Sequence, residues 1–110
     1  MKPPIIMLAA NAALQELPSA HLAELCRRWR ISRLDVFGSI LRSDFGSESD
    51  VDFLVEFEPG AGIGFFGLSD LQRELEGAVG RRVDLVSRCG LNPVIRESVL
   101  ASARPVYAVG

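Results

Sequence analysis

The chain has 110 residues, 48% of them hydrophobic, and a formal net charge of −2 from 12 Lys and Arg against 14 Asp and Glu. This length and composition fit one domain, residues 1–110, with a real hydrophobic core. Neither half of the chain has a cluster of Lys and Arg residues, which argues against electrostatic binding of a nucleic-acid phosphate backbone. We therefore expect no direct nucleic-acid binding. His21 is the only histidine, and a site that needs two histidines is therefore excluded.

The N-terminal stretch and the cysteines favour a cytoplasmic protein without membrane association. Pro3-Pro4 interrupts the first apolar run, which is too short to span a bilayer. We expect residues 1–17 to form a helix or a loosely ordered arm, and no cysteine-rich domain follows to support a signal peptide. Cys26 and Cys89 belong to no metal-spaced set, and isolated thiols in a non-secreted chain are more often free than paired. Helical spacing places Cys26 on a buried stripe.

Hydrophobic periodicity predicts helices and strands in alternation, which indicates an α/β sandwich. The expected elements, in chain order, are a helix from Ser19 to about Trp29, a strand 31–37, a helical turn through Arg42, a strand 51–57, a helix 67–79, a strand 82–86, a helix 93–102 and an edge strand 105–109. Ser19 is the expected cap of the first helix, and Gly80 the expected stop of the second. Asn92-Pro93 is a good start for the third.

Three acidic residues fall on or beside two strands that should be neighbours. Period-two alternation puts Asp50 and Asp52 on one face, and Asp84 lies inside the next strand, RVDLV. Strands joined by one helical crossover are usually adjacent, so Asp84 can come within a few ångströms of the pair. Clustered carboxylates repel one another and persist with a compensating cation. Oxygen ligands alone favour Mg²⁺, or Mn²⁺, and the arrangement is typical of two-metal phosphoryl transfer.

The alternative is that these acids have no joint role. Asp50 would then be a turn residue, Asp52 a solvated strand residue and Asp84 an edge charge. A lone DxD near a turn is usually of this kind. Because strands are depleted in Asp, the two mid-strand positions favour a functional site.

Gly38-Ser39 closes a strand and opens a helical turn. Glycine lets a ligand approach the backbone, and Ser39 adds a hydroxyl beside the free amides of a helix start, which suits a triphosphate. Arg42, one turn further along, could reach a phosphate oxygen. Taken alone, a Gly-Ser pair is most often only a turn.

The stretch GIGFFG at 62–67 is a literal GxGxxG, which could mark a dinucleotide site. Residues 58–61 separate it from the preceding strand, and its two phenylalanines would crowd a pyrophosphate. The chain is also too short for the second half of a dinucleotide fold. A loop whose phenylalanines dock on the core or on a partner is the favoured interpretation.

Gly38-Ser39, ten intervening residues and then Asp50-Val51-Asp52 form a GS-x10-DxD pattern. With its surroundings, FGSILRSDFGSESDVDFLVEF and the later RRVDLV, it closely resembles the minimal (MNT-type) nucleotidyltransferases of the polymerase-β-like superfamily. The resemblance spans about residues 31–109 and implies a single-domain polymerase-β-like α/β fold with helices packed on a mixed sheet. One departure is Ser43, where many relatives carry glycine.

The resemblance also implies roles for the singled-out residues. Gly38 and Ser39 would hold the nucleotide phosphates, and Asp50 and Asp52 would bind both of two Mg²⁺ ions. Asp84 would complete the catalytic metal site and help to deprotonate the attacking hydroxyl.

Minimal members of this family imply a particular partner. Many are antitoxins encoded beside a HEPN-domain ribonuclease toxin, and they transfer AMP from ATP onto a toxin tyrosine. The expected function is therefore a protein adenylyltransferase antitoxin in a hetero-oligomer with such a toxin. Two alternatives stay open: a binding antitoxin that acts by occlusion alone, and nucleotidyl transfer to a small molecule such as an aminoglycoside.

Overall fold

The computed structural model describes residues 17–41 and 49–109. Its helices are α2 (Ser19–Arg28), α3 (Phe65–Val79) and α4 (Pro93–Ser102), and its strands are β1 (Ile31–Phe37), β2 (Val51–Phe57), β3 (Val83–Ser87) and β4 (Arg104–Ala108). Two short 3₁₀ turns, η1 (Gly38–Leu41) and η2 (Arg88–Gly90), follow β1 and β3. The predicted order of helices and strands is confirmed. The predicted N-terminal arm, apart from Leu17, lies outside the described residues.

The four strands form one mixed sheet in the order β3-β2-β1-β4. β1 runs antiparallel to both β2 and β4, whereas β2 and β3 are parallel. A parallel pair needs a crossover connection, and α3 supplies it between β2 and β3. The mixed sheet and the adjacency of the strands on either side of α3 agree with the prediction.

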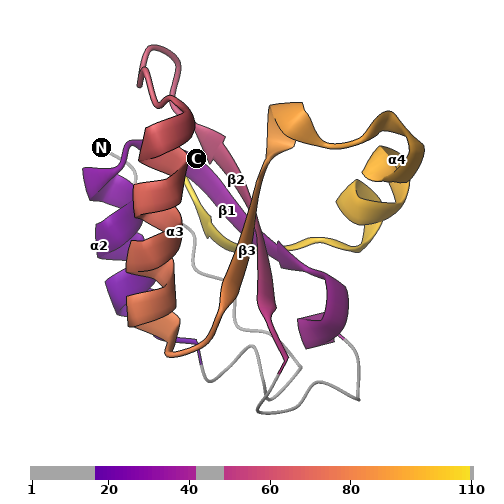
Figure 1. Cartoon of the computed structure of the whole chain (residues 1–110), viewed down its shortest axis with the longest axis horizontal. Helices are drawn as coiled ribbons and strands as arrows, with labels where there is room; N and C mark the ends of the chain where they lie inside the picture. Colours follow the sequence, from indigo (N-terminus) through magenta and orange to yellow (C-terminus); the bar gives the residue numbers. More distant parts are fainter. Residues whose placement is uncertain (1–16, 42–48, 110) are drawn as a thin grey trace.

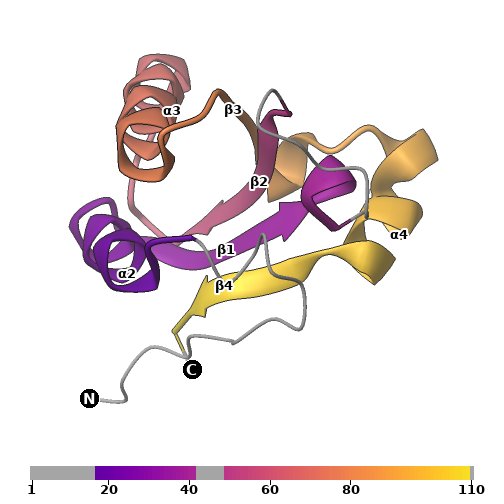
Figure 2. The ribbon, with the colours of Figure 1, turned by 90° about the horizontal axis from the view of Figure 1, so that it is seen from below.

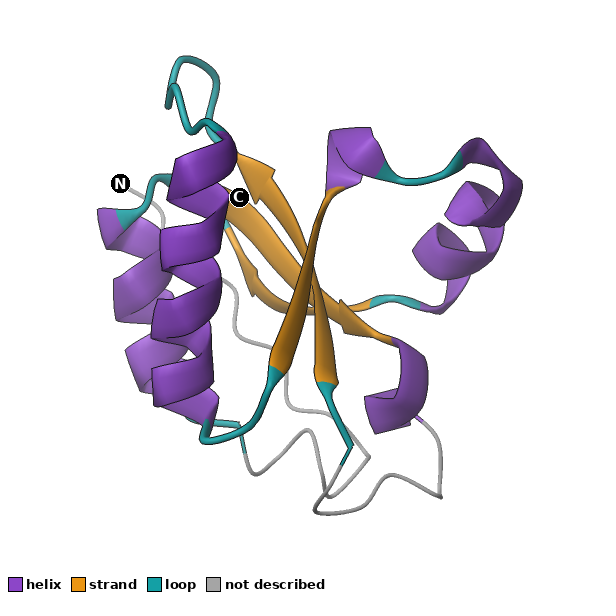
Figure 3. Cartoon of the chain, in the orientation of Figure 1, coloured by secondary structure: helices purple, strands orange, loops and turns teal. Residues whose placement is uncertain are grey.

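Helices lie on both sides of this sheet (Figure 1, Figure 3). α2 and α3 lie side by side against one face, and the end-on view shows α4 on the opposite side (Figure 2). The hydrophobic core fills the space between the sheet and the α2–α3 pair. It includes Leu22, Leu25, Cys26, Ile31, Leu34, Val36, Val51, Phe53, Val55, Leu71, Leu75 and Val83. By contrast, no residue of α4 is buried.

Two helix starts differ from the prediction. Pro18, and not Ser19, is the N-cap of α2, because the Leu22 amide donates to the Pro18 carbonyl at 2.9 Å. Helix α3 begins at Phe65, two residues before the expected start, and the Leu68 amide donates to the Gly64 carbonyl at 3.1 Å. In both cases a backbone carbonyl earlier in the chain than expected accepts the first helical hydrogen bond.

The predicted stop of α3, the predicted cap of α4 and the predicted burial of Cys26 are confirmed. Gly80 ends α3 in the left-handed region with φ of 72°. Asn92 caps α4, since its side chain accepts a 2.9 Å hydrogen bond from the Val94 amide. Cys26 is buried and Cys89 exposed, and both thiols are free. Among the described residues, no helix is long and apolar enough to cross a membrane.

Candidate active site

The end of β1 brings a glycine directly against an acidic side chain of β2. Phe37, the last residue of β1, pairs with Asp52, and η1 begins at the next residue, Gly38. Gly38 has φ of +77°, and a Cβ built on it would stand 2.3 Å from Oδ2 of Asp52. Real Cβ atoms do not approach other atoms this closely. The Asp52 carboxylate therefore occupies space that any residue other than glycine would fill at position 38.

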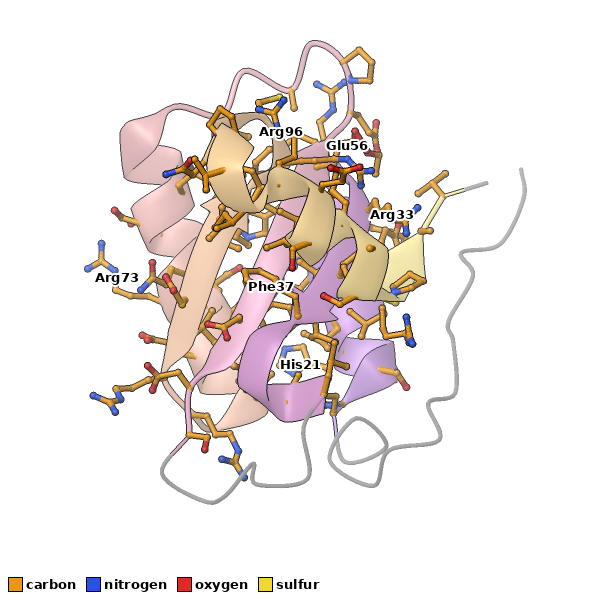
Figure 4. All side chains as sticks on the ribbon, turned by 90° about the vertical axis from the view of Figure 1, so that its right-hand side faces the viewer. His21, Arg33, Phe37, Glu56, Arg73 and Arg96 are labelled. Atoms are coloured by element: carbon orange, nitrogen blue, oxygen red, sulfur yellow. The ribbon has the colours of Figure 1, made fainter. Side chains whose placement is uncertain are left out.

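The turn that carries Gly38 is fixed to the body of the protein. Ile40 is only 1% exposed and belongs to the hydrophobic core, and Leu41 packs against the same core. Burial of these side chains holds η1 against the sheet, so the backbone at Gly38 and Ser39 has a set position beside Asp52. Figure 4 shows Phe37 next to this turn, on the side of the sheet that faces α4.

The second acidic strand lies beside the first, as predicted. Asp52 and Asp84 are partners in the parallel β2–β3 ladder, and partners in neighbouring strands are about 4.8 Å apart along the hydrogen-bonding direction. Both side chains point to the face opposite α2 and α3, because Val51, Phe53 and Val83 on either side of them point into the core. Asp52 is half-buried, whereas Asp84 on the edge strand is exposed.

Asp50 makes a different contact. It stands just before β2, and its Oδ1 lies 3.1 Å from Nε of Arg82. The register explains the pairing: Val51 pairs with Val83, and the Val51 amide donates to the Arg82 carbonyl at 2.9 Å. Asp50 and Arg82 consequently face each other across the start of the two parallel strands.

The three predicted carboxylates are therefore only partly brought together. Asp52 and Asp84 are neighbours, but within the described residues no three His, Cys, Asp or Glu side chains are grouped so that they could hold a metal ion. This differs from the expected three-carboxylate cluster, and Asp50 is seen in an ion pair with Arg82. The donor set still fits a hard cation, since it consists of carboxylate oxygens. The Ser39 side chain and Arg42 lie outside what the structure describes.

The sequence pattern missed another charged pair on this face. Asp35 of β1 is 1% exposed and lies two residues before Phe37 on the same side of the sheet. Nε of Arg33 donates to both of its carboxylate oxygens, at 2.9 and 3.1 Å. Arg33 in turn pairs in register with Glu56, and Figure 4 shows both residues on this face. The signal was visible in the sequence as a mid-strand Asp with Arg two residues before it.

The sequence also did not predict the ion pair of Arg82 with Asp50. The sequence predicted Arg82 as the first residue of a strand 82–86, whereas β3 begins at Val83, and its partner depends on parallel pairing of β2 and β3. Once that register is known, the residue before Val83 must face the residue before Val51.

These features define a small α/β domain in which a glycine turn and two acidic strands meet at one site. Residues 19–106 match the family described as nucleotidyltransferase domain, and the chain belongs to this family. It is therefore a transferase with the minimal form of the polymerase-β-like fold, as the sequence predicted.

Relatives and solved structures agree with this assignment. The chain is 38% identical over 94 residues to a protein named protein adenylyltransferase MntA from Thermococcus cleftensis, and the match covers 83% of this chain and 93% of the relative. A solved minimal nucleotidyltransferase superposes with a TM-score of 0.66 at 41% identity, covering 79% of this chain and 87% of the other. A toxin–antitoxin structure with AMP-PNP shares the fold, with a TM-score of 0.70 at 20% identity over 84% of this chain and 75% of the other.

Proposed function

We propose that this chain is an antitoxin that transfers AMP from ATP to a tyrosine of a HEPN-domain ribonuclease toxin. The observation that carries the proposal is the contact of Gly38 with the Asp52 carboxylate, beside Asp84 on the next strand. The relative at 38% identity is named a protein adenylyltransferase, and this chain covers 93% of its length. Solved structures of the same fold include an MntA–HepT toxin–antitoxin complex.

The acidic residues would act on a metal-bound nucleotide. Asp50, Asp52 and Asp84 would hold two Mg²⁺ ions, or Mn²⁺, which when bound neutralise triphosphate charge. The backbone of η1, at Gly38 and Ser39, would contact the phosphates, because glycine at position 38 lets this turn lie directly beside the Asp52 carboxylate that would bind the nucleotide's metal ions.

Proton transfer falls to Asp84 in this proposal. The acceptor tyrosine oxygen attacks the α-phosphorus of ATP, and the bond to the departing pyrophosphate breaks. The hydroxyl proton passes to the Asp84 carboxylate, and pyrophosphate leaves with the electron pair of the broken bond. Asp84 suits this role because it is exposed on an edge strand, where a large acceptor can approach.

The toxin would supply the acceptor tyrosine, and it would form a hetero-oligomer with this chain. A protein acceptor is favoured over a small molecule because the described residues show Asp84 on an open edge of the sheet and not inside an enclosed cavity. A cytoplasmic location follows from the same proposal, since the toxin would cleave RNA inside the cell.

The test is a mass measurement of the toxin after incubation with this chain, ATP and Mg²⁺. The toxin should gain the mass of one or more adenylyl groups, on tyrosine, and Asp52→Asn should abolish the gain. Asp70→Asn is the matched control, because Asp70 is an exposed acid on α3 that pairs with Arg73 on the far side of the sheet. An unchanged toxin mass with the wild-type chain would refute the transfer reaction.

Neutralisation by occlusion is distinguished in the same assay. If the Asp50→Asn, Asp52→Asn double variant still silences the toxin's ribonuclease activity, binding alone is sufficient. If silencing disappears together with the mass gain, the transfer is the mechanism.

A further inference from the structure

The contact between Asp50 and Arg82 is set by the architecture of the sheet. The two residues precede paired positions of β2 and β3, and the Val51 amide bonds the Arg82 carbonyl at 2.9 Å. The guanidinium Nε then reaches Oδ1 of Asp50 at 3.1 Å. Arg81 makes a different contact, in which its Nη1 donates to the backbone carbonyl of Ser49 at 3.3 Å. The Arg82 guanidinium thus lies on the Asp50 carboxylate, and the Arg81 guanidinium lies on a backbone carbonyl.

This contact bears on metal binding, because a guanidinium and a divalent cation can compete for the same carboxylate oxygen. Asp50 is one of three acids assigned to the metal in the proposed function. In the described residues the three are not grouped for an ion, and Asp50 is held by Arg82. A cation that binds Oδ1 of Asp50 therefore competes with the guanidinium for that oxygen.

We propose that Arg82 is a positioning residue that competes with the divalent cation for Asp50. Without metal it holds the carboxylate and supplies positive charge at the entrance to the acidic strands. With metal it releases Asp50 to join Asp52 and Asp84. The inference rests on the proposed function, since it takes Asp50 to be a metal ligand.

The size of the effect follows from exposure. The Arg82 side chain is 78% exposed and that of Asp50 47%, and exposed ion pairs of this kind change an equilibrium constant by about 1.4- to 5-fold. Removing Arg82 should tighten metal binding by a factor in this range. Removing any nearby positive charge would also tighten metal binding, because it removes electrostatic repulsion of the cation. The control variant must therefore lose one positive charge as well.

The experiment is a titration of the full chain with Mn²⁺ alone, without nucleotide, in which free Mn²⁺ is followed by electron paramagnetic resonance. Arg82→Gln should lower the Kd for Mn²⁺ by about 1.4- to 5-fold relative to Arg81→Gln, the variant that loses an equal charge one residue away. Arg82→Lys keeps the charge but not the planar fork, and should fall between wild type and Arg82→Gln. In an Asp50→Asn background the two Gln variants should bind Mn²⁺ equally, because the competed carboxylate is gone.

Three results decide the matter. Equal Kd values for Arg82→Gln and Arg81→Gln, with Asp50→Asn weakened, would overturn this inference and leave the proposed function intact. An advantage of Arg82→Gln that persists in the Asp50→Asn background would also overturn it. If the wild type binds no Mn²⁺, or Asp50→Asn binds it as well as wild type, the metal role in the proposed function itself fails.

Discussion

The most direct test of the candidate active site is the substitution Gly38→Ala, which places a methyl group where the Asp52 carboxylate now lies. A Cβ at this position would be 2.3 Å from Oδ2 of Asp52. Because Oδ2 is the end of a side chain that can rotate, we expect the carboxylate to move by about 1 Å, a displacement that can cost about 100-fold in rate. The φ of +77° adds a backbone cost of about 1–2 kcal/mol for a residue with a Cβ.

Gly80→Ala separates these two costs. Gly80 has φ of +72°, close to that of Gly38, and no described atom lies within 4 Å of a Cβ built there. Both variants should lose about 4–16 °C in Tm, from a cost of about 1–2 kcal/mol in a domain of this size. Only Gly38→Ala should also lose adenylyl transfer and weaken Mn²⁺ binding. The reasoning is refuted if Gly38→Ala keeps the transfer rate of Gly80→Ala at equal folded fraction.

Three further predictions concern the scaffold. Asn92→Ala should destabilise α4 by about 1 kcal/mol through loss of its cap, measured as faster amide exchange in residues 93–102; unchanged exchange would contradict the capping bond. A thiol reagent at pH 8 should label exposed Cys89 in the native protein and Cys26 only after unfolding, because burial raises the pKa of Cys26 to about 12; equal labelling rates would count against the packing of α2. A hydrogen bond from Trp29 lowers the pKa of Glu74 below its ordinary 4.5, against an opposing effect of desolvation. The ionised Glu74 side chain therefore stabilises the folded state above pH 4.5, and this stabilisation is lost as the pH falls through the pKa of Glu74 in the folded protein. The difference in urea midpoint between wild type and Glu74→Gln should narrow on acidification; a difference that widens would contradict the prediction.

Much of the sheet could be predicted because its strands have a strong pattern. The bounds of β1 and β2 follow from apolar residues, alternating in β2, that end at a glycine turn and at a Gly/Pro loop. The starts of α2 and α3 could not be read in this way. A side-chain cap leaves a signal in the sequence, whereas the carbonyls of Pro18 and Gly64 that accept the first helical bonds leave none.

The identity of the acidic residues was predictable, but their contacts were not. Period two and a single crossover are enough to bring Asp52 beside Asp84. The approach of Asp52 to Gly38 depends on the β1–β2 register, which pairs Phe37 with Asp52. Register is a tertiary property, fixed by which faces are buried, so the sequence pattern identifies the acidic residues but not the partner of each carboxylate.

The two faces of the sheet carry different kinds of side chain. The face under α2 and α3 carries the hydrophobic core, and the other face carries the charges. Asp35 shows how this fold accommodates a carboxylate that it buries, since Arg33 donates to both of its oxygens. Asp84 lies on the same face but at the exposed edge strand, where water can solvate its charge. Asp52 and Asp84 each stand second in their strands and point away from the core, so the domain can bring these two negative charges together without placing either in its hydrophobic interior.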